Sequence, residues 1–257
     1  ILVGHSKKYV EFIENIQTSN HITHLDADTY FGKGSLNAAK RGVGANISAV
    51  NAVMSGEFNN AFSAIRPPGH HAETEKAMGF CIFGNVAIAA KYAIENHKLK
   101  RVAVVDFDVH HGNGTQEILW DDPNVLLIST HQMPLWPGSG AHEEHGKHQN
   151  ILNIPIQANT DGPAFRQKFD EIILPQLDSY KPEILIISAG FDAHYKDPLA
   201  NIELMTEDYE WITHRLCDIA DEHADGRLIS SLEGGYNLAA LAESVAVHVK
   251  VLMERSK

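Results

Sequence analysis

The sequence is poor in cysteine and in positive charge, and it lacks any hydrophobic run long enough to span a membrane. Its two cysteines, Cys81 and Cys217, are too few for a disulfide scaffold and fit a reducing compartment. No apolar run approaches the ~20 residues of a membrane helix, and no secretory signal opens the chain. We therefore expect a cytoplasmic protein that does not bind a membrane.

Negative charge dominates the ionisable side chains. The chain has 21 Lys and Arg against 33 Asp and Glu, which gives a formal net charge of −12 with neutral histidines. This balance argues against a nucleic-acid partner, because phosphates require clustered Lys and Arg, and it favours cationic partners. The 16 histidines point to a metal enzyme, since imidazole is the commonest metal ligand.

The length and composition are those of an ordinary globular protein. The 257 residues are 44% hydrophobic and 21% charged, and they contain no internal repeat, low-complexity tract or linker-like stretch. One large α/β domain can hold a chain of this size. We therefore predict a single domain over residues 1–257.

Short apolar runs alternate with longer segments of helical periodicity. Runs of about four to eight apolar residues without alternation are typical of strands buried on both faces of a parallel sheet. The predicted strands are 61–65, 101–106, 125–130, 151–156, 183–189 and 227–232, and the predicted helices are 35–54, 83–97, 163–180, 206–224 and 238–253. This order implies right-handed βαβ units. The sequence thus predicts an α/β protein of three layers, an open and mainly parallel sheet with helices on both faces.

Polar residues and glycines follow four of the predicted strands. Sheets of this kind bind their ligands beyond the carboxyl ends of the strands, so these residues predict one common site. Glycines at the same places let the backbone turn sharply. The candidates are His70 and His71 after 61–65, Asp106 at the end of 101–106 with Asp108 and His110 after it, Asp192 after 183–189, and Tyr236 after 227–232.

The densest group of candidates, at 106–110, has the spacing of a metal site. Alternate residues of an extended segment face the same way, so Asp108 and His110 can reach one ion while Asp106 turns toward a neighbour. Asp192, from an adjacent strand, completes a set of two carboxylates and one imidazole. Such a set leaves a coordination position open, as in catalytic zinc sites. The structural alternative is that the aspartates cap turns and His110 packs at a strand end.

His70 and His71 follow two prolines and a glycine, which hold the segment in a defined shape. We interpret them as two imidazoles over the metal-bound water, one of them a general base, with a carboxylate such as Asp106 orienting one ring. The Tyr236 hydroxyl can hydrogen-bond a carbonyl oxygen as negative charge develops there. The alternatives are a structural histidine pair and a tyrosine that packs at the surface.

Four further histidines, His131, His142, His145 and His148, crowd one loop together with two glutamates. Their spacing suggests a second metal site. A polar surface loop explains them better, and we predict the latter.

The candidate motifs together resemble the zinc-dependent histone deacetylase superfamily, which also contains acetylpolyamine amidohydrolases and acetoin-utilisation proteins. The resemblance covers nearly the whole chain from about His5 onward, and segments 108–116 and 233–236 are similar to the class II branch and its bacterial relatives. It rests on five ordered segments, 66–73, 79–81, 106–116, 188–194 and 233–237.

This resemblance implies the arginase/deacetylase α/β fold, in agreement with the alternation of strands and helices. Family chains usually begin with a front segment that supplies an edge strand and a rim loop. Here the match starts inside the pattern, at residues 1–12, so we expect that segment to be absent from this chain or shorter in this protein.

The resemblance also implies a role for each candidate. It makes Asp108, His110 and Asp192 the ligands of one zinc ion, which lowers the pKa of a bound water toward ~7. His71 becomes the proton shuttle of the imidazole pair, and Tyr236 becomes the group that polarises the substrate carbonyl.

Two side chains are implied to support the imidazole pair. Asp106 would hold His70. Asn113 stands behind His71, where class I relatives have a carboxylate, so we expect His71 to be less strongly stabilised when charged.

A narrow tunnel for an acylated alkyl chain is implied by Gly79, Phe80 and Trp136. Leu199 matches the apolar residue of lysine deacetylases rather than the acidic gate of some polyamine deacetylases. The positions that match the family's monovalent cation site, which takes K+ or Na+, are Asp106, Asp108, His110, Ser129 and Thr130.

The expected function is zinc-dependent removal of acetyl or short acyl groups from lysine side chains of proteins or peptides. One alternative is a deacetylase of acetylpolyamines or other small acylated amines, which the acidic charge favours and Leu199 disfavours. A second is an arginase-like hydrolase with two metals, for which too few carboxylates cluster. A third is a catalytically silent acyl-lysine or metal-binding module, which the complete set of ligands, base and tyrosine disfavours.

Overall fold

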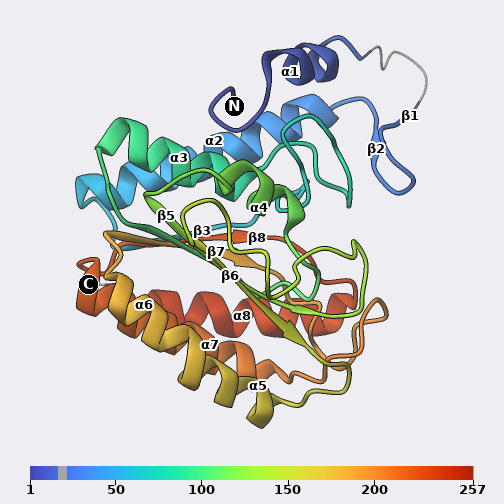
Figure 1. Cartoon of the computed structure of the whole chain (residues 1–257). Coiled ribbons are helices and arrows are strands. Elements are labelled where there is room, and N and C mark those ends of the chain that lie inside the picture. Colours follow the sequence, from blue (N-terminus) through green and yellow to red (C-terminus); the bar gives the residue numbers. More distant parts are fainter. Residues whose placement is uncertain (17–21, 257) are drawn as a thin grey trace.

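The computed structural model describes residues 1–16 and 22–256. Its elements in chain order are α1 (Lys7–Glu14), β1 (Thr23–His24), β2 (Tyr30–Phe31), α2 (Ser35–Ser55), β3 (Asn60–Ser63), α3 (Asn85–His97), β4 (Val102–Asp106), α4 (Asn113–Leu119), β5 (Val125–Gln132), β6 (Ile151–Ile156), α5 (Gly162–Lys168), the π-helical turn η1 (Phe169–Ile173), α6 (Leu174–Tyr180), β7 (Ile184–Ala189), α7 (Thr206–His223), β8 (Leu228–Leu232) and α8 (Leu238–Glu254) (Figure 1).

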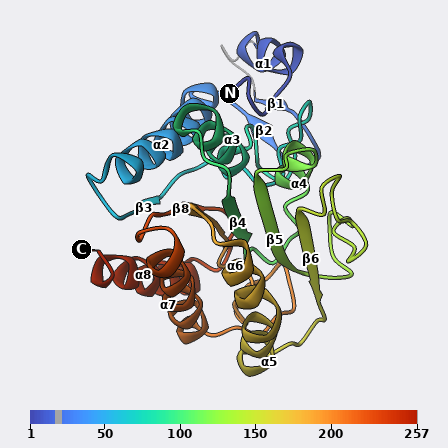
Figure 2. The same ribbon diagram turned by 60° about the vertical axis from the view of Figure 1, so that its left-hand side comes forward.

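One parallel sheet organises the molecule. Within the described residues it has six strands in the order β3-β8-β7-β4-β5-β6, while β1 and β2 form a separate antiparallel pair. Helices α2, α3 and α4 cover one face of the sheet, and α5, α6, α7 and α8 cover the other (Figures 1 and 2). The prediction of a three-layer α/β protein with a parallel sheet is confirmed.

Each face of the sheet packs against its own hydrophobic core, which explains why the strand sequences are continuous apolar runs. In β4, Ala103 and Val105 pack into the core beneath α5–α8, whereas Val102 and Val104 pack into the core beneath α2–α4. Because both faces of the sheet are covered by helices, neither set of side chains can be polar.

Strand β4 lies where the order of strands reverses. It pairs with β5 on one side and with β7 on the other, because the chain runs outward through β5 and β6 before it returns to β7 and β8. The crevice beyond the carboxyl ends of the strands at such a reversal is the usual ligand site of open α/β sheets. Asp106 ends β4 and Ala189 ends β7, so the predicted site falls at this point.

The predicted helix 163–180 is continuous but not uniform. The Asp161 side chain accepts a hydrogen bond from the Ala164 N–H at 3.0 Å, and Pro163 occupies the first turn. A π-helical turn then precedes Pro175, which has no backbone N–H to donate.

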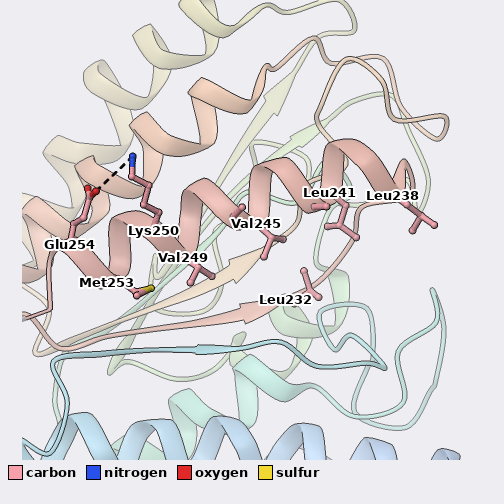
Figure 3. A pocket seen from close by; sticks show the side chains of 10 residues that line it. Leu232, Leu238, Leu241, Val245, Val249, Lys250, Met253 and Glu254 are labelled. Carbon is pink, nitrogen blue, oxygen red and sulfur yellow. Dashed lines mark ion pairs between the residues drawn. The ribbon is translucent and has the colours of Figure 1, made fainter.

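Helix α8 carries apolar side chains on two faces. One face packs against the sheet, while on the other Leu238 and Met253 are 79% and 72% exposed. Figure 3 shows Leu241, Val245 and Val249 of α8 near Leu232 of β8, and these residues line a groove of about 780 Å³. No helix within residues 1–16 and 22–256 is long and apolar enough to cross a membrane.

His248 is a buried histidine between α8 and the sheet. Its Nδ1–H donates to Thr213 Oγ1 at 2.7 Å, because that hydroxyl already donates to the Tyr209 carbonyl, and its Nε2 accepts from Ser230 Oγ at 2.9 Å. Burial lowers the pKa of His248 from 6.5 to about 3. The folded chain therefore holds this ring neutral at pH values where the unfolded chain protonates it.

We predict that His248 makes the folded state sensitive to acid. Because the pKa is lower in the folded state, the stabilisation is complete above pH 6.5 and falls by about 1.4 kcal/mol per pH unit as the pH drops toward about 3. In His248→Gln this part of the slope should disappear, since the amide can replace both hydrogen bonds without titrating. Urea unfolding between pH 7 and pH 5 measures the slope, and parallel slopes for the two proteins would contradict the assignment.

Candidate active site

Three potential metal ligands meet beyond the ends of β4 and β7. His110 Nδ1 lies 3.2 Å from Asp108 Oδ1 and 3.0 Å from Asp192 Oδ2. Each residue offers one ligand atom, and these atoms lie within 4.8 Å of one another. All three side chains are buried. The structure thus brings together the three residues that the sequence predicted as metal ligands.

Glycines allow the two carboxylates to approach the backbone closely. A Cβ atom on Gly190 would lie 2.0 Å from Asp108 Oδ2, and one on Gly234 would lie 2.3 Å from Asp192 Oδ2. The Gly234 N–H donates to Asp108 Oδ2 at 2.8 Å, and the Val109 N–H donates to Asp192 Oδ1 at 2.9 Å. These contacts fix both carboxylates from one side.

The electrostatics of this group favour a bound cation. Burial lowers the pKa of His110, but hydrogen bonds and charges from Asp108 and Asp192 outweigh burial and raise it to about 10. Burial and the charge of Asp108 raise the pKa of Asp192 to about 7. Buried carboxylates of this kind require a positive partner. Two carboxylate oxygens and one imidazole nitrogen form a donor set that fits zinc, so Asp108, His110 and Asp192 would hold it.

The two adjacent histidines lie beside this group with their expected partners. His70 Nδ1 lies 3.1 Å from Asp106 Oδ2, and His71 Nδ1 lies 2.9 Å from Asn113 Oδ1. The ring centroids of the pair are 3.9 Å apart, and both rings are buried. Asp106 and Asn113 therefore stand behind the two rings as predicted.

The surroundings give the two rings opposite protonation. Burial and the neighbouring His70 lower the pKa of His71 well below its usual value, which leaves this ring neutral. Burial also lowers the pKa of His70, but Asp108, Asp106 and Glu233 outweigh it and raise the pKa well above its usual value. Of the two, His71 is the ring able to accept a proton.

A cavity of about 220 Å³ leads to the candidate ligands. The four residues predicted to form a tunnel, Gly79, Phe80, Trp136 and Leu199, all line it. The remaining lining residues are Asp28, His71, His110, Leu135 and Tyr236. Asp28 and Leu135 are not among the site residues that the sequence predicted.

Tyr236 faces this cavity from the loop after β8. Its ring centroid lies 5.8 Å from that of Phe80 and 6.5 Å from that of His110. Burial and the charges of Asp192 and Asp108 raise the pKa of its hydroxyl, which therefore remains a hydrogen-bond donor. The Tyr236 N–H donates to Asp197 Oδ2 at 2.7 Å, which fixes the loop.

Glu233 is a supporting residue that the sequence prediction missed. Its buried carboxylate accepts hydrogen bonds from the N–H groups of Gly69 at 2.7 Å and His70 at 3.1 Å. Ser188 Oγ also donates to it, at 3.2 Å. Its place directly after β8 is the signal that could have revealed it.

The prediction of a polar surface loop is wrong for His131. This residue lies inside β5 and is buried. Its Nε2–H donates to the Gly140 carbonyl at 2.8 Å, and its Nδ1 accepts from Ser129 Oγ at 2.9 Å, so the ring is buried without an unpaired nitrogen. His142 and His148 are exposed and His145 is half-buried, as that prediction requires.

The predicted positions of a monovalent cation site also lie together. Asp106 on β4 is paired in register with Ser129 on β5, and Thr130 Oγ1 donates to the Asp106 carbonyl at 3.4 Å. Both residues of β5 are buried. Binding of K+ or Na+ at this place stays a prediction.

Comparison with known proteins agrees with this geometry. Residues 1–252 match the model of the histone deacetylase domain. The chain belongs to the histone deacetylase family.

Two curated members of the histone deacetylase family are similar over most of this chain. Histone deacetylase 10, chloroplastic, of Oryza sativa subsp. japonica is 38% identical over 259 residues, which cover 96% of this chain and 58% of that protein. The histone deacetylase-like amidohydrolase of Pseudomonas aeruginosa is 42% identical over 220 residues, which cover 84% of this chain and 58% of that protein. The chain thus spans less than two thirds of either relative.

The solved structure of the HDA15 HD domain has the same fold. It superposes with a TM-score of 0.91 at 34% sequence identity, over 97% of this chain and 71% of that chain. This chain therefore has the arginase/deacetylase fold.

We predict that Asp192→Ala abolishes tight zinc binding. Wild-type protein should take up one zinc ion per chain, and zinc at about 1,000 times its Kd should stabilise the fold by roughly 4 kcal/mol. Asp192→Ala should lose both effects, because one of the three ligands is gone. Metal analysis after dialysis and thermal unfolding with and without zinc measure them.

The matched control is Asp178→Ala. Asp178, Glu222 and His223 form a second group with ligand-like spacing, at the surface of α6 and α7. This variant should keep the single tightly bound zinc. Loss of the ion from Asp178→Ala, with retention in Asp192→Ala, would move the metal centre to the surface group.

Proposed function

We propose that the chain is a zinc-dependent amide hydrolase that removes acetyl or short acyl groups from lysine side chains of proteins or peptides. The observation that carries this proposal is the meeting of Asp108, His110 and Asp192 below a cavity whose walls include His71 and Tyr236. Membership of the histone deacetylase family supports the same reaction class.

The proposed metal supplies one part of the chemistry. When bound by its three ligands, zinc polarises the substrate amide and lowers the pKa of a water molecule toward ~7. The remaining steps belong to the side chains around the cavity.

His71 is the proposed general base. Its Nδ1–H donates to Asn113 Oδ1, so Nε2 carries the free lone pair. The lowered pKa keeps the ring neutral, and Nε2 can therefore accept the proton of the attacking water and later deliver it to the departing amine. His70 is held by Asp106, and its ring centroid lies 3.9 Å from that of His71.

Tyr236 is the proposed donor to the substrate oxygen. Its hydroxyl stays protonated because burial and two nearby carboxylates raise its pKa. A hydroxyl that donates to this oxygen stabilises the negative oxygen of the tetrahedral intermediate more than the neutral carbonyl of the substrate. It therefore accelerates the reaction rather than only tightening binding.

We predict that Tyr236→Phe lowers kcat by about a hundredfold or more with little change in KM. Loss of one such donor costs roughly 2.7–4 kcal/mol of transition-state stabilisation. Steady-state rates of zinc-loaded protein on an acetyl-lysine peptide measure the effect. The control is Tyr195→Phe, on an exposed side chain, which should keep the wild-type rate; an equal rate for Tyr236→Phe would remove this residue from the mechanism.

A second candidate substrate is an acetylated polyamine. The net charge of −12 and the carboxylate of Asp28 in the cavity wall favour a substrate with additional positive charges. Leu199, at 46% exposure in the same wall, offers no charge to such a substrate. Because Leu199 is apolar, we place the acyl-lysine substrate before the polyamine.

We predict that Leu199→Glu shifts the preference toward polyamines. A carboxylate at the cavity wall can pair with a second ammonium group, and such a contact is worth about tenfold in kcat/KM. The ratio of kcat/KM for an acetylated polyamine to that for an acetyl-lysine peptide measures the shift. A wild-type enzyme that already prefers the polyamine would overturn the assignment of substrate class.

A further inference from the structure

Behind His71, the side-chain amide of Asn113 is held between two groups. On one side, Asn113 Oδ1 lies 2.9 Å from His71 Nδ1. On the other side, Asn113 Nδ2 donates to Glu73 Oε1 at 2.7 Å and to Met78 Sδ at 3.3 Å. Asn113 and Met78 are buried and Glu73 is half-buried, so water does not replace these contacts freely.

The amide can point in only one direction in these surroundings. A carboxylate and a thioether are both acceptors, so the side that faces Glu73 and Met78 must be the NH2 group of Asn113. Rotating the amide by 180° would place its oxygen against the Glu73 carboxylate. The oxygen therefore faces His71, and the charge of Glu73 enforces that choice.

The direction of the amide determines the tautomer of His71. An oxygen opposite Nδ1 requires a proton on Nδ1 and leaves the lone pair on Nε2. A flipped amide would donate to Nδ1, and the ring proton would then sit on Nε2. A neutral ring of that second tautomer cannot accept a proton at Nε2, whatever its pKa.

We propose that Glu73 is a positioning residue that fixes the tautomer of His71 through the Asn113 amide. This inference rests on the proposed function only in making His71 Nε2 the proton acceptor; the tautomer itself can be observed without turnover. Behind His71, the second histidine of the pair, this chain has the neutral amide of Asn113, and the carboxylate of Glu73 lies on the far side of that amide.

The direct test is nitrogen NMR of the His71 ring in 15N-histidine-labelled zinc-loaded protein, with His71→Gln identifying its signals. The wild type should carry the proton on Nδ1. In Glu73→Lys the neighbour of the amide becomes a donor, so the amide should turn and the proton should move to Nε2. An unchanged tautomer in Glu73→Lys would overturn the proposal, even if turnover fell.

The kinetic test uses a rescue. Glu73→Lys should lower kcat by about ten- to a hundredfold with KM within about twofold, inside the roughly 10²–10⁴-fold that a general base contributes. Glu73→Gln should lose less, because its oxygen can still accept from Asn113 Nδ2. Adding Asn113→Asp to Glu73→Lys should restore kcat to within about tenfold of wild type, since a carboxylate at 113 accepts from Nδ1 and pairs with the lysine.

Glu75→Lys is the matched control. It makes the same change of charge two residues away at an exposed position and should leave kcat and the His71 tautomer unchanged. A double variant no faster than Glu73→Lys, at equal thermal stability, would contradict the proposal. A wild-type protein with the Nδ1–H tautomer but no hydrolysis of any acyl-amine would instead overturn the proposed function and leave the role of Glu73 intact.

Discussion

The structure depends on keeping two carboxylates, Asp108 and Asp192, buried around one imidazole. Two buried carboxylates are stable only beside a positive charge, and accordingly they raise the pKa of His110. The parallel sheet brings these side chains together because two adjacent strands, β4 and β7, end at the same point. The glycines that follow those strands remove the Cβ atoms that would otherwise keep the carboxylates away from the backbone.

Around this group, each reactive side chain is held by a partner from a different part of the chain. Asp106 holds His70, Glu233 holds the backbone before it, and Asp197 holds the backbone of Tyr236. These partners come from the end of β4 and from the segments after β8 and β7, so the site forms only when these strands are assembled. The same hydrogen bonds therefore stabilise the folded chain and hold the site in position before substrate binds.

The sheet and most of the site were predictable because they follow regular periodicities. Buried strands such as β4 read as apolar runs, and the strand-end rule then gave His70, Asp108 and Asp192. The short helices α1 and α4 escaped prediction because each spans only about two turns. Glu73 escaped because its role appears only when Asn113, forty residues away, lies beside it. Burial of His131 depended in the same way on a distant carbonyl.

The claim that one metal ion joins Asp108, His110 and Asp192 is tested most directly by X-ray absorption at the zinc edge of zinc-loaded protein. The account predicts a single imidazole with oxygen ligands at about 2.0–2.2 Å and no sulfur. Scattering from sulfur near 2.3 Å, from several imidazoles, or from a second metal at about 3.5–4 Å would contradict it.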